Sequence, residues 1–387
     1  MLLGSDVLFE RQLLRGRTVG LVCNPASIDA SFRHIVRRAE TDGLRIGAIF
    51  GPQHGLKSDV QENMIESAHA EDARRQVPVY SLYSETREPT AEMLRGLDAL
   101  VIDLQDVGTR IYTYIYTMAN CLRAGAKHGI PVVVCDRPNP VDGVTVEGPM
   151  LDAGFESFVG QFPIPMRHGM TIGECARLFN EHFGIGAKLE VIAMQGWTRA
   201  SYFDETGLSW VLPSPNLPTL EGAITYPGTV LFEGTNVSEG RGTTKPFELL
   251  GAPWVTDTDV FADRLNALRL PGVHFRAHWF EPTFHKHARV TCGGIQMHIT
   301  DRRSFRAVES GVALLQAFYE AGPEAFAWRE PPYEYEYVIP PIDILYGSAR
   351  LREAIEQRVP ASDIAAEWPA ASADFGAVRE RFLLYPS

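Results

Sequence analysis

The sequence lacks an excess of positive charge, long apolar runs and paired cysteine motifs. Its 36 Lys and Arg residues are outnumbered by 48 Asp and Glu residues, which gives a formal net charge of −12. This balance argues against a general nucleic-acid binder, which needs a basic surface to meet phosphates. No window approaches the ~18 apolar residues of a transmembrane helix, and Asp6, Glu10 and Arg11 interrupt the apolar core of a signal peptide. We therefore expect a soluble, cytoplasmic protein with no nucleic-acid or membrane partner.

The cysteines and glycines give no metal-binding or nucleotide-binding pattern. Five cysteines are scattered, with neither a CxxC motif nor a Cys/His ligand spacing, which argues against a structural zinc site. His285 and His287 would share one face of a strand, but two ligands are too few for a metal site. No GxGxxG follows the first predicted strand and no GxxxxGK[ST] occurs, which argues against a dinucleotide site. We expect no metal and no cofactor.

The first 140 residues alternate short apolar runs with helical patterns. Runs rich in β-branched residues predict strands at 18–23, 46–50, 77–83, 99–104 and 131–135, and helix-type spacing predicts helices at 30–39, 91–97 and 115–128. Continuous apolarity suits strands that helices cover on both faces. The order predicts an open, mostly parallel, doubly wound α/β sheet. We expect this Rossmann-like domain to cover residues 1–150.

Residues 151–387 have a different texture, and we expect a smaller α/β domain with long substrate-binding loops. Thr171 and Glu174 form a capping-box pattern that opens a helix reaching about Phe183. Residues 213–254 are rich in Pro and Gly and predict a long binding loop, since such loops in compact proteins are usually functional. The other predicted elements are strands at 188–194, 273–280 and 290–299 and helices at 305–319, 349–357 and 374–382.

Polar residues follow the predicted strands of the first domain. In a parallel sheet, ligands bind beyond the carboxyl ends of the strands. The residues found there are Asn24, Gln53, His54, Asp103, Asp106, Arg110, Tyr112, Arg137 and Asn139. They predict a site for a ligand that is not a nucleotide.

A second group of polar residues lies between residues 233 and 243. It contains Glu233, Asn236, Glu239 and Arg241, which are suited to bind hydroxyls and carboxylates. One glutamate could act as an acid or a base. Alternatively, Glu239 and Arg241 pair and brace the loop.

Histidine and aromatic residues near these motifs have two interpretations each. His54 and His168 lie in polar turns framed by Gly or Pro, and each either contacts a ligand or braces the backbone. Tyr112 and Tyr226 could form a sugar subsite, or they belong to the core.

Nine motifs occur in an order that resembles one known family. They are 51–55 (GPQHG), 103–114 (DLQDVGTRIYTY), 136–140 (DRPNP), 146–149 (VEGP), 165–171 (PMRHGMT), 213–218 (PSPNLP), 226–229 (YPGT), 232–243 and 298–302 (HITDR). From about residue 15 to the C-terminus, the chain resembles the exo-β-N-acetylmuramidase (NamZ-type) family of peptidoglycan hexosaminidases. The resemblance implies a Rossmann-like domain, a smaller α/β domain and an active site in the cleft between them. It also implies release of terminal N-acetylmuramic acid from peptidoglycan fragments, as in cell-wall recycling, without a nucleotide or an obligatory metal.

The chain departs from this family at Gln53. Many members carry Glu there, a prime candidate for the catalytic carboxyl, and an amide cannot exchange a catalytic proton as a carboxyl does. Glu62 and Glu66 could replace it if the loop at 56–67 folds back, as could Glu233 and Glu239. We expect Glu239 or Glu66 as the acid and Asp103 or Asp106 on the opposite side of the sugar.

The remaining candidates would hold the substrate, a muramic-acid-containing saccharide. His54, which is also a catalytic candidate, is expected to position the sugar. The other predicted substrate-binding residues are Asn24, Gln53, Arg110, Tyr112, Arg137, Asn139, Arg167, His168, Asn216, Glu233, Asn236 and Arg241. An arginine suits the lactyl carboxylate of muramic acid, because its planar fork binds carboxylates bidentately. A homo-oligomer is compatible with the sequence.

Two other functions remain open. Loss of the acid at position 53 could leave a non-catalytic protein that binds muropeptides or sugars. The chain could also be a metal-dependent hydrolase that uses His54, Asp103, Asp106 and Asp136.

Overall fold

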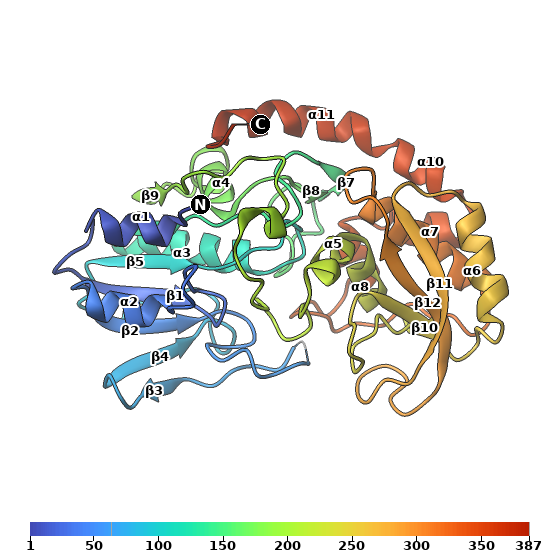
Figure 1. The fold of residues 1–387 in the computed structure, drawn as a ribbon. Helices are drawn as coiled ribbons and strands as arrows, with labels where there is room; N and C mark the ends of the chain where they lie inside the picture. Colours follow the sequence, from blue (N-terminus) through green and yellow to red (C-terminus); the bar gives the residue numbers. More distant parts are fainter. Residues whose placement is uncertain (63, 387) are drawn as a thin grey trace.

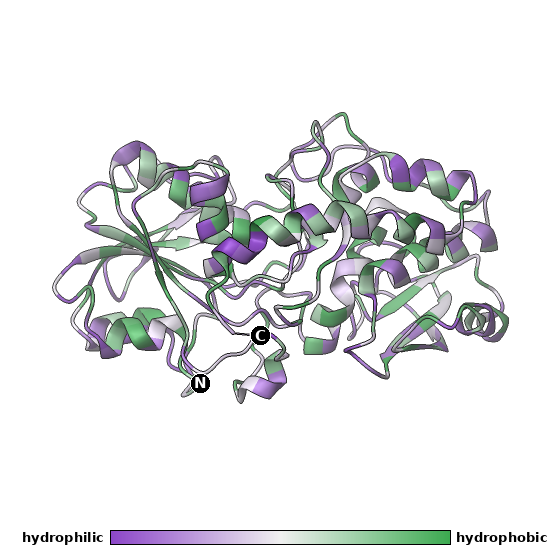
Figure 2. Cartoon of the chain, turned by 90° about the horizontal axis from the view of Figure 1, so that it is seen from above, coloured by the Kyte–Doolittle hydropathy of each residue, from purple (hydrophilic) through white to green (hydrophobic). Residues whose placement is uncertain are grey.

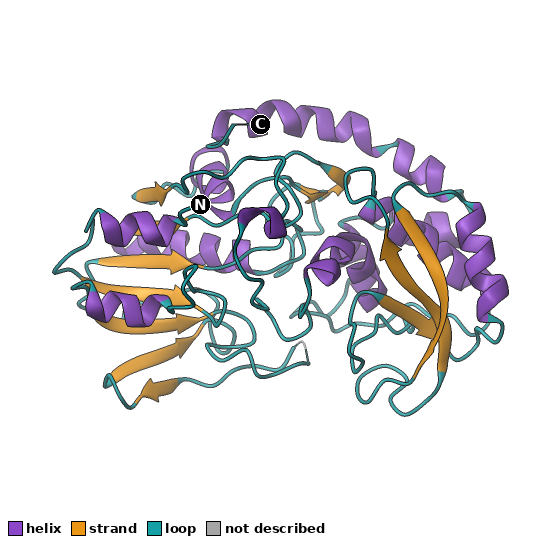
Figure 3. Cartoon of the chain, viewed as in Figure 1, coloured by secondary structure: helices purple, strands orange, loops and turns teal. Residues whose placement is uncertain are grey.

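The computed structural model describes residues 1–62 and 64–386, which form two α/β units joined by a layer of loops (Figures 1 and 3). The first unit is built on a seven-stranded sheet in the order β3-β4-β2-β1-β5-β6-β9. Its strands are β1 (Thr18–Cys23), β2 (Arg45–Gly51), β3 (Ala70–Asp72), β4 (Val77–Ser81), β5 (Ala99–Asp103), β6 (Val132–Cys135) and β9 (Leu189–Ile192). All neighbouring strands are parallel except β3 and β4. The predicted doubly wound, mostly parallel sheet is confirmed.

Alternate residues of these strands are buried against helices on opposite faces. Val19 and Leu21 of β1 pack with α1 (Gly4–Glu10) and α2 (Ile35–Thr41). Val22 belongs to the other core, with α3 (Tyr114–His128). The central strands β1, β5 and β6 are therefore mostly apolar, and the hydropathy colouring shows much green along the strands of this unit (Figure 2).

Three features of the first unit differ from the sequence predictions. Residues 91–97 form turns instead of a helix. The predicted helix at 30–39 begins only at Ile35, where His34 caps it by accepting a hydrogen bond from the Val36 amide. β9 pairs with β6, so the first sheet uses chain beyond the expected boundary at residue 150. The helix predicted from the capping box does form: Thr171 and Glu174 make both reciprocal hydrogen bonds at the start of α4 (Ile172–Arg177), which continues as the π-helix η1 (Leu178–His182).

The second unit is built on the antiparallel sheet β10-β12-β11. Its strands are β10 (Leu249–Ala252), β11 (Val273–Phe280) and β12 (Cys292–Ile299), and its helices are α5 (Leu220–Thr229), the 3₁₀-helix η3 (Val230–Gly234), α6 (Thr258–Ala267), α7 (Ala307–Ala321), α8 (Pro341–Tyr346), α9 (Arg350–Glu356) and α10 (Ala361–Ala366). The expected irregular loop at 213–254 thus contains α5, η3 and β10. Gly228 of α5 and Gly311 of α7 allow these helices to touch, since a Cβ at either position would overlap the backbone of the other helix.

Two smaller elements and the C-terminal segment connect the units. The hairpin of β7 (Glu147–Met150) and β8 (Pro165–Arg167) lies between the two main sheets, and the 3₁₀-helix η2 (Phe203–Thr206) follows β9. Helix α11 (Trp368–Arg379) and η4 (Glu380–Phe382) run across the top of the molecule in Figure 1 and return to the first unit. There Tyr385 donates a hydrogen bond to Asp136, and the Leu384 amide donates one to Glu174. No helix in the described part of the chain is long and apolar enough to span a membrane.

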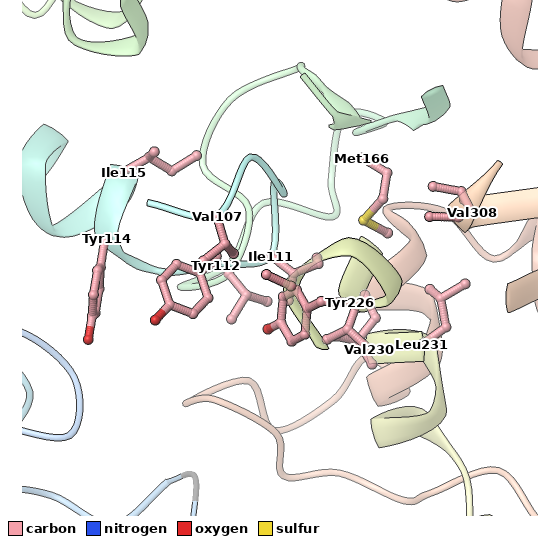
Figure 4. Close-up of a cluster of buried hydrophobic side chains, with 14 of the residues drawn as sticks. Val107, Ile111, Tyr112, Tyr114, Ile115, Met166, Tyr226, Val230, Leu231 and Val308 are labelled. Atoms are coloured by element: carbon pink, nitrogen blue, oxygen red, sulfur yellow. The ribbon is translucent and has the colours of Figure 1, made fainter. Parts of the chain in front are cut away.

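An apolar cluster fills the layer between the units. Figure 4 shows Ile111 and Tyr112, from the loop after β5, packed with Tyr226 of α5, and the cluster extends to Met166 and Val308. The rings of Tyr112 and Tyr226 meet edge to face with centroids 5.9 Å apart. The two units therefore share one core.

Arg110 ties this layer together from within. Its Nη1 donates hydrogen bonds to the carbonyls of Pro149 and Ile164, and its Nη2 donates to those of Leu345 and Tyr346 in α8, at distances of 2.7 to 3.2 Å. Burial lowers the pKa of Arg110 to about 10, so the side chain remains charged at neutral pH. The loop after β5 is thus fixed against both the hairpin region and α8.

Arg110→Met should destabilise the fold by about 3–5 kcal/mol, because four buried carbonyls lose their donor. Urea denaturation of the two proteins measures the difference. Arg303→Met is the matched control, since the Arg303 side chain is 60% exposed, and it should change stability by less than about 0.5 kcal/mol. A loss at Arg110 no larger than in the control would contradict the proposed structural role.

Candidate active site

A polar cavity lies where the two units meet. The first unit contributes the turn after β2 and the loop between β5 and α3, and the second contributes α5, η3 and the segments near residues 241 and 333. The lining residues are Gln53, His54, Ile111, Tyr112, Thr113, Tyr114, Val159, Ser214, Asn216, Leu217, Tyr226, Glu233, Arg241, Phe247, Tyr333 and Glu334.

Glu334 is a buried carboxyl held by residues of the first unit. Thr113 donates a hydrogen bond to Gln53 Oε1 at 2.8 Å, which directs the Gln53 amide nitrogen toward Glu334. Gln53 Nε2 donates to Glu334 Oε1 at 3.0 Å, and the Tyr83 hydroxyl donates to Oε2 at 2.7 Å. Burial, and then repulsion from Glu233, raise the pKa of Glu334 to about 7 even though both hydrogen bonds favour the ionised form. Near neutral pH this carboxyl can therefore donate a proton.

Glu233 occupies a different environment in the same cavity. The Tyr333 hydroxyl donates a hydrogen bond to Glu233 Oε2 at 2.6 Å, and Arg241 Nη1 lies 2.7 Å from Oε1. A hydroxyl donor and a guanidinium both suit a carboxylate. The cavity thus contains two glutamates, of which one is built to hold a proton and the other is paired with a cation.

Glu239 lies behind Arg241 and does not line the cavity. It accepts hydrogen bonds from Arg241 Nη1 at 3.0 Å and Lys286 Nζ at 2.7 Å, and His285 Nδ1 lies 3.4 Å away. Burial opposes its charge, but Lys286 and the other partners outweigh burial and hold the pKa well below its usual range. The geometry argues against the expected role of Glu239 as the acid and favours the alternative, that it pairs with Arg241 and braces the loop.

His54 lines the cavity as a neutral ring. Its Nδ1 lies 2.9 Å from the Val60 carbonyl, which can only accept, so Nδ1 carries the proton. Burial lowers the pKa of His54 to about 4, so Nε2 keeps its lone pair at neutral pH. His54 can accept a hydrogen bond from a sugar hydroxyl.

Three lining residues adopt left-handed backbone conformations that non-glycine residues rarely use. His54 has φ 69°, Phe247 φ 65° and Glu334 φ 44°. Such conformations cost of order 1 kcal/mol each and gather at functional sites, where the surrounding structure enforces them.

Six of the predicted site residues meet in this cavity: Gln53, His54, Tyr112, Asn216, Glu233 and Arg241. Asn216 also donates a hydrogen bond to the Gln61 carbonyl at 2.5 Å, which ties the segment at 213–218 to the loop after β2. The cavity therefore brings together some residues from the strand ends of the first unit and some from the segment at 233–243.

The other predicted catalytic carboxyls lie elsewhere. Asp103 forms a buried ion pair with Arg137. Asp106 accepts a hydrogen bond from the Gly108 amide at 2.7 Å within its own turn. Glu66 is exposed and accepts a hydrogen bond from the Tyr335 hydroxyl outside the cavity. The expected catalytic roles of Asp103, Asp106 and Glu66 therefore have no support in the geometry, and the exposed Glu62 does not line the cavity either.

Most of the remaining substrate-binding candidates bind the protein itself. They interact mainly with backbone groups or with carboxylates of the chain: Asn24 with Pro213, Arg110 with four carbonyls, Arg137 with Asp103 and Ile28, Asn139 with Met170 and Val141, Arg167 with Val141 and Asp142, His168 with Met170, and Asn236 with Ala325 and Ala327. These side chains hold loops in place through contacts within the protein. Contrary to expectation, none of them lines the cavity.

The residues proposed for a metal-dependent hydrolase are not gathered either. His54 lines the cavity, whereas Asp103 pairs with Arg137 and Asp136 accepts hydrogen bonds from Thr171 and Gly173. Within residues 1–62 and 64–386, no three His, Cys, Asp or Glu side chains form a group that could hold a metal ion.

Sequence reasoning missed Glu334, Tyr333, Thr113 and Tyr83. Thr113 lies inside a recognised motif, so its proximity to Gln53 could have been suspected. Glu334 and Tyr333 belong to a run of alternating Tyr and Glu at 333–337, and no local pattern distinguishes the buried Glu334 from the half-buried Glu336.

Comparisons with known proteins match the whole length of the chain. Residues 19–221 match the family model for the exo-beta-N-acetylmuramidase NamZ N-terminal domain, and residues 224–385 match the model for its C-terminal domain. The peptidoglycan beta-N-acetylmuramidase NamZ of Bacillus subtilis (strain 168) is 44% identical over 385 residues, which cover 99% of this chain and 91% of that protein.

Two crystal structures of DUF1343 family proteins from Bacteroides fragilis NCTC 9343 have the same fold. One is 33% identical with a TM-score of 0.89, covering 99% of this chain and 98% of the other. The second is 26% identical with a TM-score of 0.79, covering 100% and 99%.

Tyr83→Phe should raise the pKa of Glu334 above about 7, because the Tyr83 hydroxyl stabilises the ionised carboxylate. Carbon-13 NMR titration of glutamate carboxyl groups measures this pKa, with Glu334→Gln identifying the signal. Tyr112→Phe is the control: Tyr112 also lines the cavity, but its hydroxyl makes no hydrogen bond with Glu334. A fall in the pKa after removal of the Tyr83 hydroxyl would refute the assignment of that hydrogen bond.

Proposed function

The chain belongs to the exo-β-N-acetylmuramidase NamZ family, and we propose that it is itself an exo-acting β-N-acetylmuramidase. It would release N-acetylmuramic acid from the non-reducing ends of peptidoglycan fragments. The observation that carries this proposal is the buried pair of glutamates in one cavity, with Glu334 close to its protonation midpoint and Glu233 paired with a guanidinium. Glycoside hydrolysis commonly needs two carboxyl groups in different protonation states.

Glu334 is the general acid in this proposal. It protonates the glycosidic oxygen as the bond to the anomeric carbon breaks, so the aglycone leaves as an alcohol. Gln53 and Tyr83 then stabilise the resulting carboxylate, because both donate to its oxygens. Water supplies the hydroxyl of the released sugar, and its second proton restores the acid.

Glu233 is the second carboxylate and faces the positive charge that develops on the sugar ring. Arg241 and Tyr333 fix its two oxygens, which limits the reorganisation needed during the reaction. His54 and Asn216 line the same cavity and are suited to bind sugar hydroxyls.

Gln53 has a positioning role in this chain. Its amide cannot donate a catalytic proton, but it lies one hydrogen bond from Glu334. Glu334, the hydrogen-bond partner of Gln53, thus provides the acid instead. This arrangement accounts for catalysis in a family member without Glu at position 53.

We further propose that this reaction takes place in the cytoplasm, in the recycling of cell-wall fragments. The acidic composition supports a role without nucleic acid, since a polyanion would be repelled. A homo-oligomeric state is compatible with the proposal, which requires only one chain for the cavity.

Glu334→Gln should lower kcat for a natural muramyl disaccharide by about 10²–10⁴-fold, because its leaving group needs a proton. An aryl β-N-acetylmuramide with an acidic phenol as leaving group should lose much less. For the wild type, kcat/KM should fall as the pH rises through about 7, since Glu334 loses its proton there. In the variant, this fall of kcat/KM with rising pH should be absent. Steady-state kinetics with both substrates measure these effects.

Glu330→Gln makes the same chemical change at an exposed position and is the control. Equal losses of activity on the two substrates in Glu334→Gln would remove Glu334 as the acid. A wild-type protein that binds the sugar without turnover would favour the non-catalytic binding protein.

A further inference from the structure

Arg241 uses only part of its guanidinium within the protein. Nη1 makes both of its polar contacts, with Glu233 Oε1 at 2.7 Å and Glu239 Oε1 at 3.0 Å. Nε is buried and has no hydrogen-bond partner, and no residue in the described part of the chain accepts a hydrogen bond from Nη2. Nε–H and one N–H of Nη2 point in the same direction, so together they form an edge that can bind a carboxylate bidentately.

This edge belongs to a side chain that lines the cavity and remains charged. Arg241 is only 6% exposed, and its guanidinium lies over the Phe247 ring, 5.0 Å from the centroid. Burial opposes the charge, but Glu233 and Glu239 outweigh it and raise the pKa of Arg241. Lys286 shares the charge of Glu239 from the opposite side, so Arg241 is not fully neutralised by its two glutamates.

Arg241 has no cationic competitor among the described residues that line the cavity. The nearby His54 is neutral, because burial lowers its pKa to about 4. An anionic group of a ligand would therefore find one charged donor there, with its bidentate edge unoccupied. A buried donor without a partner is unfavourable until such a group arrives.

We propose that the Nε–Nη2 edge of Arg241 binds the carboxylate of the lactyl ether of N-acetylmuramic acid and thereby selects this sugar over N-acetylglucosamine. The inference rests on the proposed function and deepens it, since the two sugars differ only by this ether at C3. A site built to bind a polar group discriminates strongly against the analogue that lacks it, because the donor then stays unpaired. Arg241 is thus a specificity-determining residue as well as the partner of Glu233.

The test compares the wild type and an Arg241 variant on three substrates that differ at C3. The probes are an aryl β-N-acetylmuramide, its lactyl methylamide, in which the carboxylate is replaced by a neutral group, and the matching N-acetylglucosaminide. In the wild type, kcat/KM for the muramide should exceed that for the methylamide by about 10²–10³-fold. In Arg241→Lys the preference should shrink to within about tenfold, because an ammonium keeps the charge near Glu233 but offers no planar edge.

A merely structural role of Arg241 predicts a different result. Loss of Glu233 positioning would lower the rates with all three substrates by the same factor and leave the preference intact, and this outcome would overturn the inference. Arg123→Lys is the control, since Arg123 pairs with Asn120 and Gln161 outside the cavity; it should keep the wild-type preference.

A second measurement needs only the wild-type protein and covers the case in which Arg241→Lys does not fold. Calorimetric titration should show that N-acetylmuramic acid binds at least about tenfold more tightly than its lactyl methylamide. Equal affinities would overturn the inference. Absence of turnover combined with this selective binding would refute the proposed hydrolase and leave the carboxylate assignment standing.

Discussion

The buried guanidinium of Arg110 is the constraint on which the cavity depends. It joins the loop after β5 to the hairpin region and α8 through hydrogen bonds to four carbonyl groups. The same loop carries Thr113, which orients Gln53. The second unit brings Glu233 and Glu334 to the same cavity. A cavity formed by two units can hold a carboxyl at a fixed protonation state only if the units do not shift, and Arg110 provides that fixation.

Three glutamates near this cavity show how environment assigns chemical roles to one residue type. Glu334 accepts hydrogen bonds from two neutral donors and lies near the negative charge of Glu233. Burial and this charge raise its pKa to about 7, so it can carry a proton near neutral pH. Glu239 has a lysine, an arginine and a histidine around it and stays ionised. Glu233 is linked to Arg241 and Tyr333. The difference comes from partners that are distant in the sequence.

The sequence predicted those parts that depend on local pattern. Apolar runs located β1, β5 and β6 because buried parallel strands need no alternation, and Thr171 with Glu174 located the start of α4. At the site, Gln53 and His54 could be found because they follow a strand end. Glu334 could not, since its burial depends on contacts with Gln53 and Tyr83 that lie 281 and 251 residues away. The sequence predicts ligand-binding roles for Arg110, Arg137 and Arg167, because it does not reveal which carbonyls and carboxylates of the chain these arginines bind.

The left-handed backbone at His54, Phe247 and Glu334 sets this protein's stability against its function. Glycine would relieve the backbone at each position, yet it would delete a side chain that shapes the cavity. At Phe247, which is buried in the core, loss of the ring would cost about 3–5 kcal/mol. This exceeds the ~1 kcal/mol of strain that glycine would relieve, so packing around the cavity keeps the strained backbone in place.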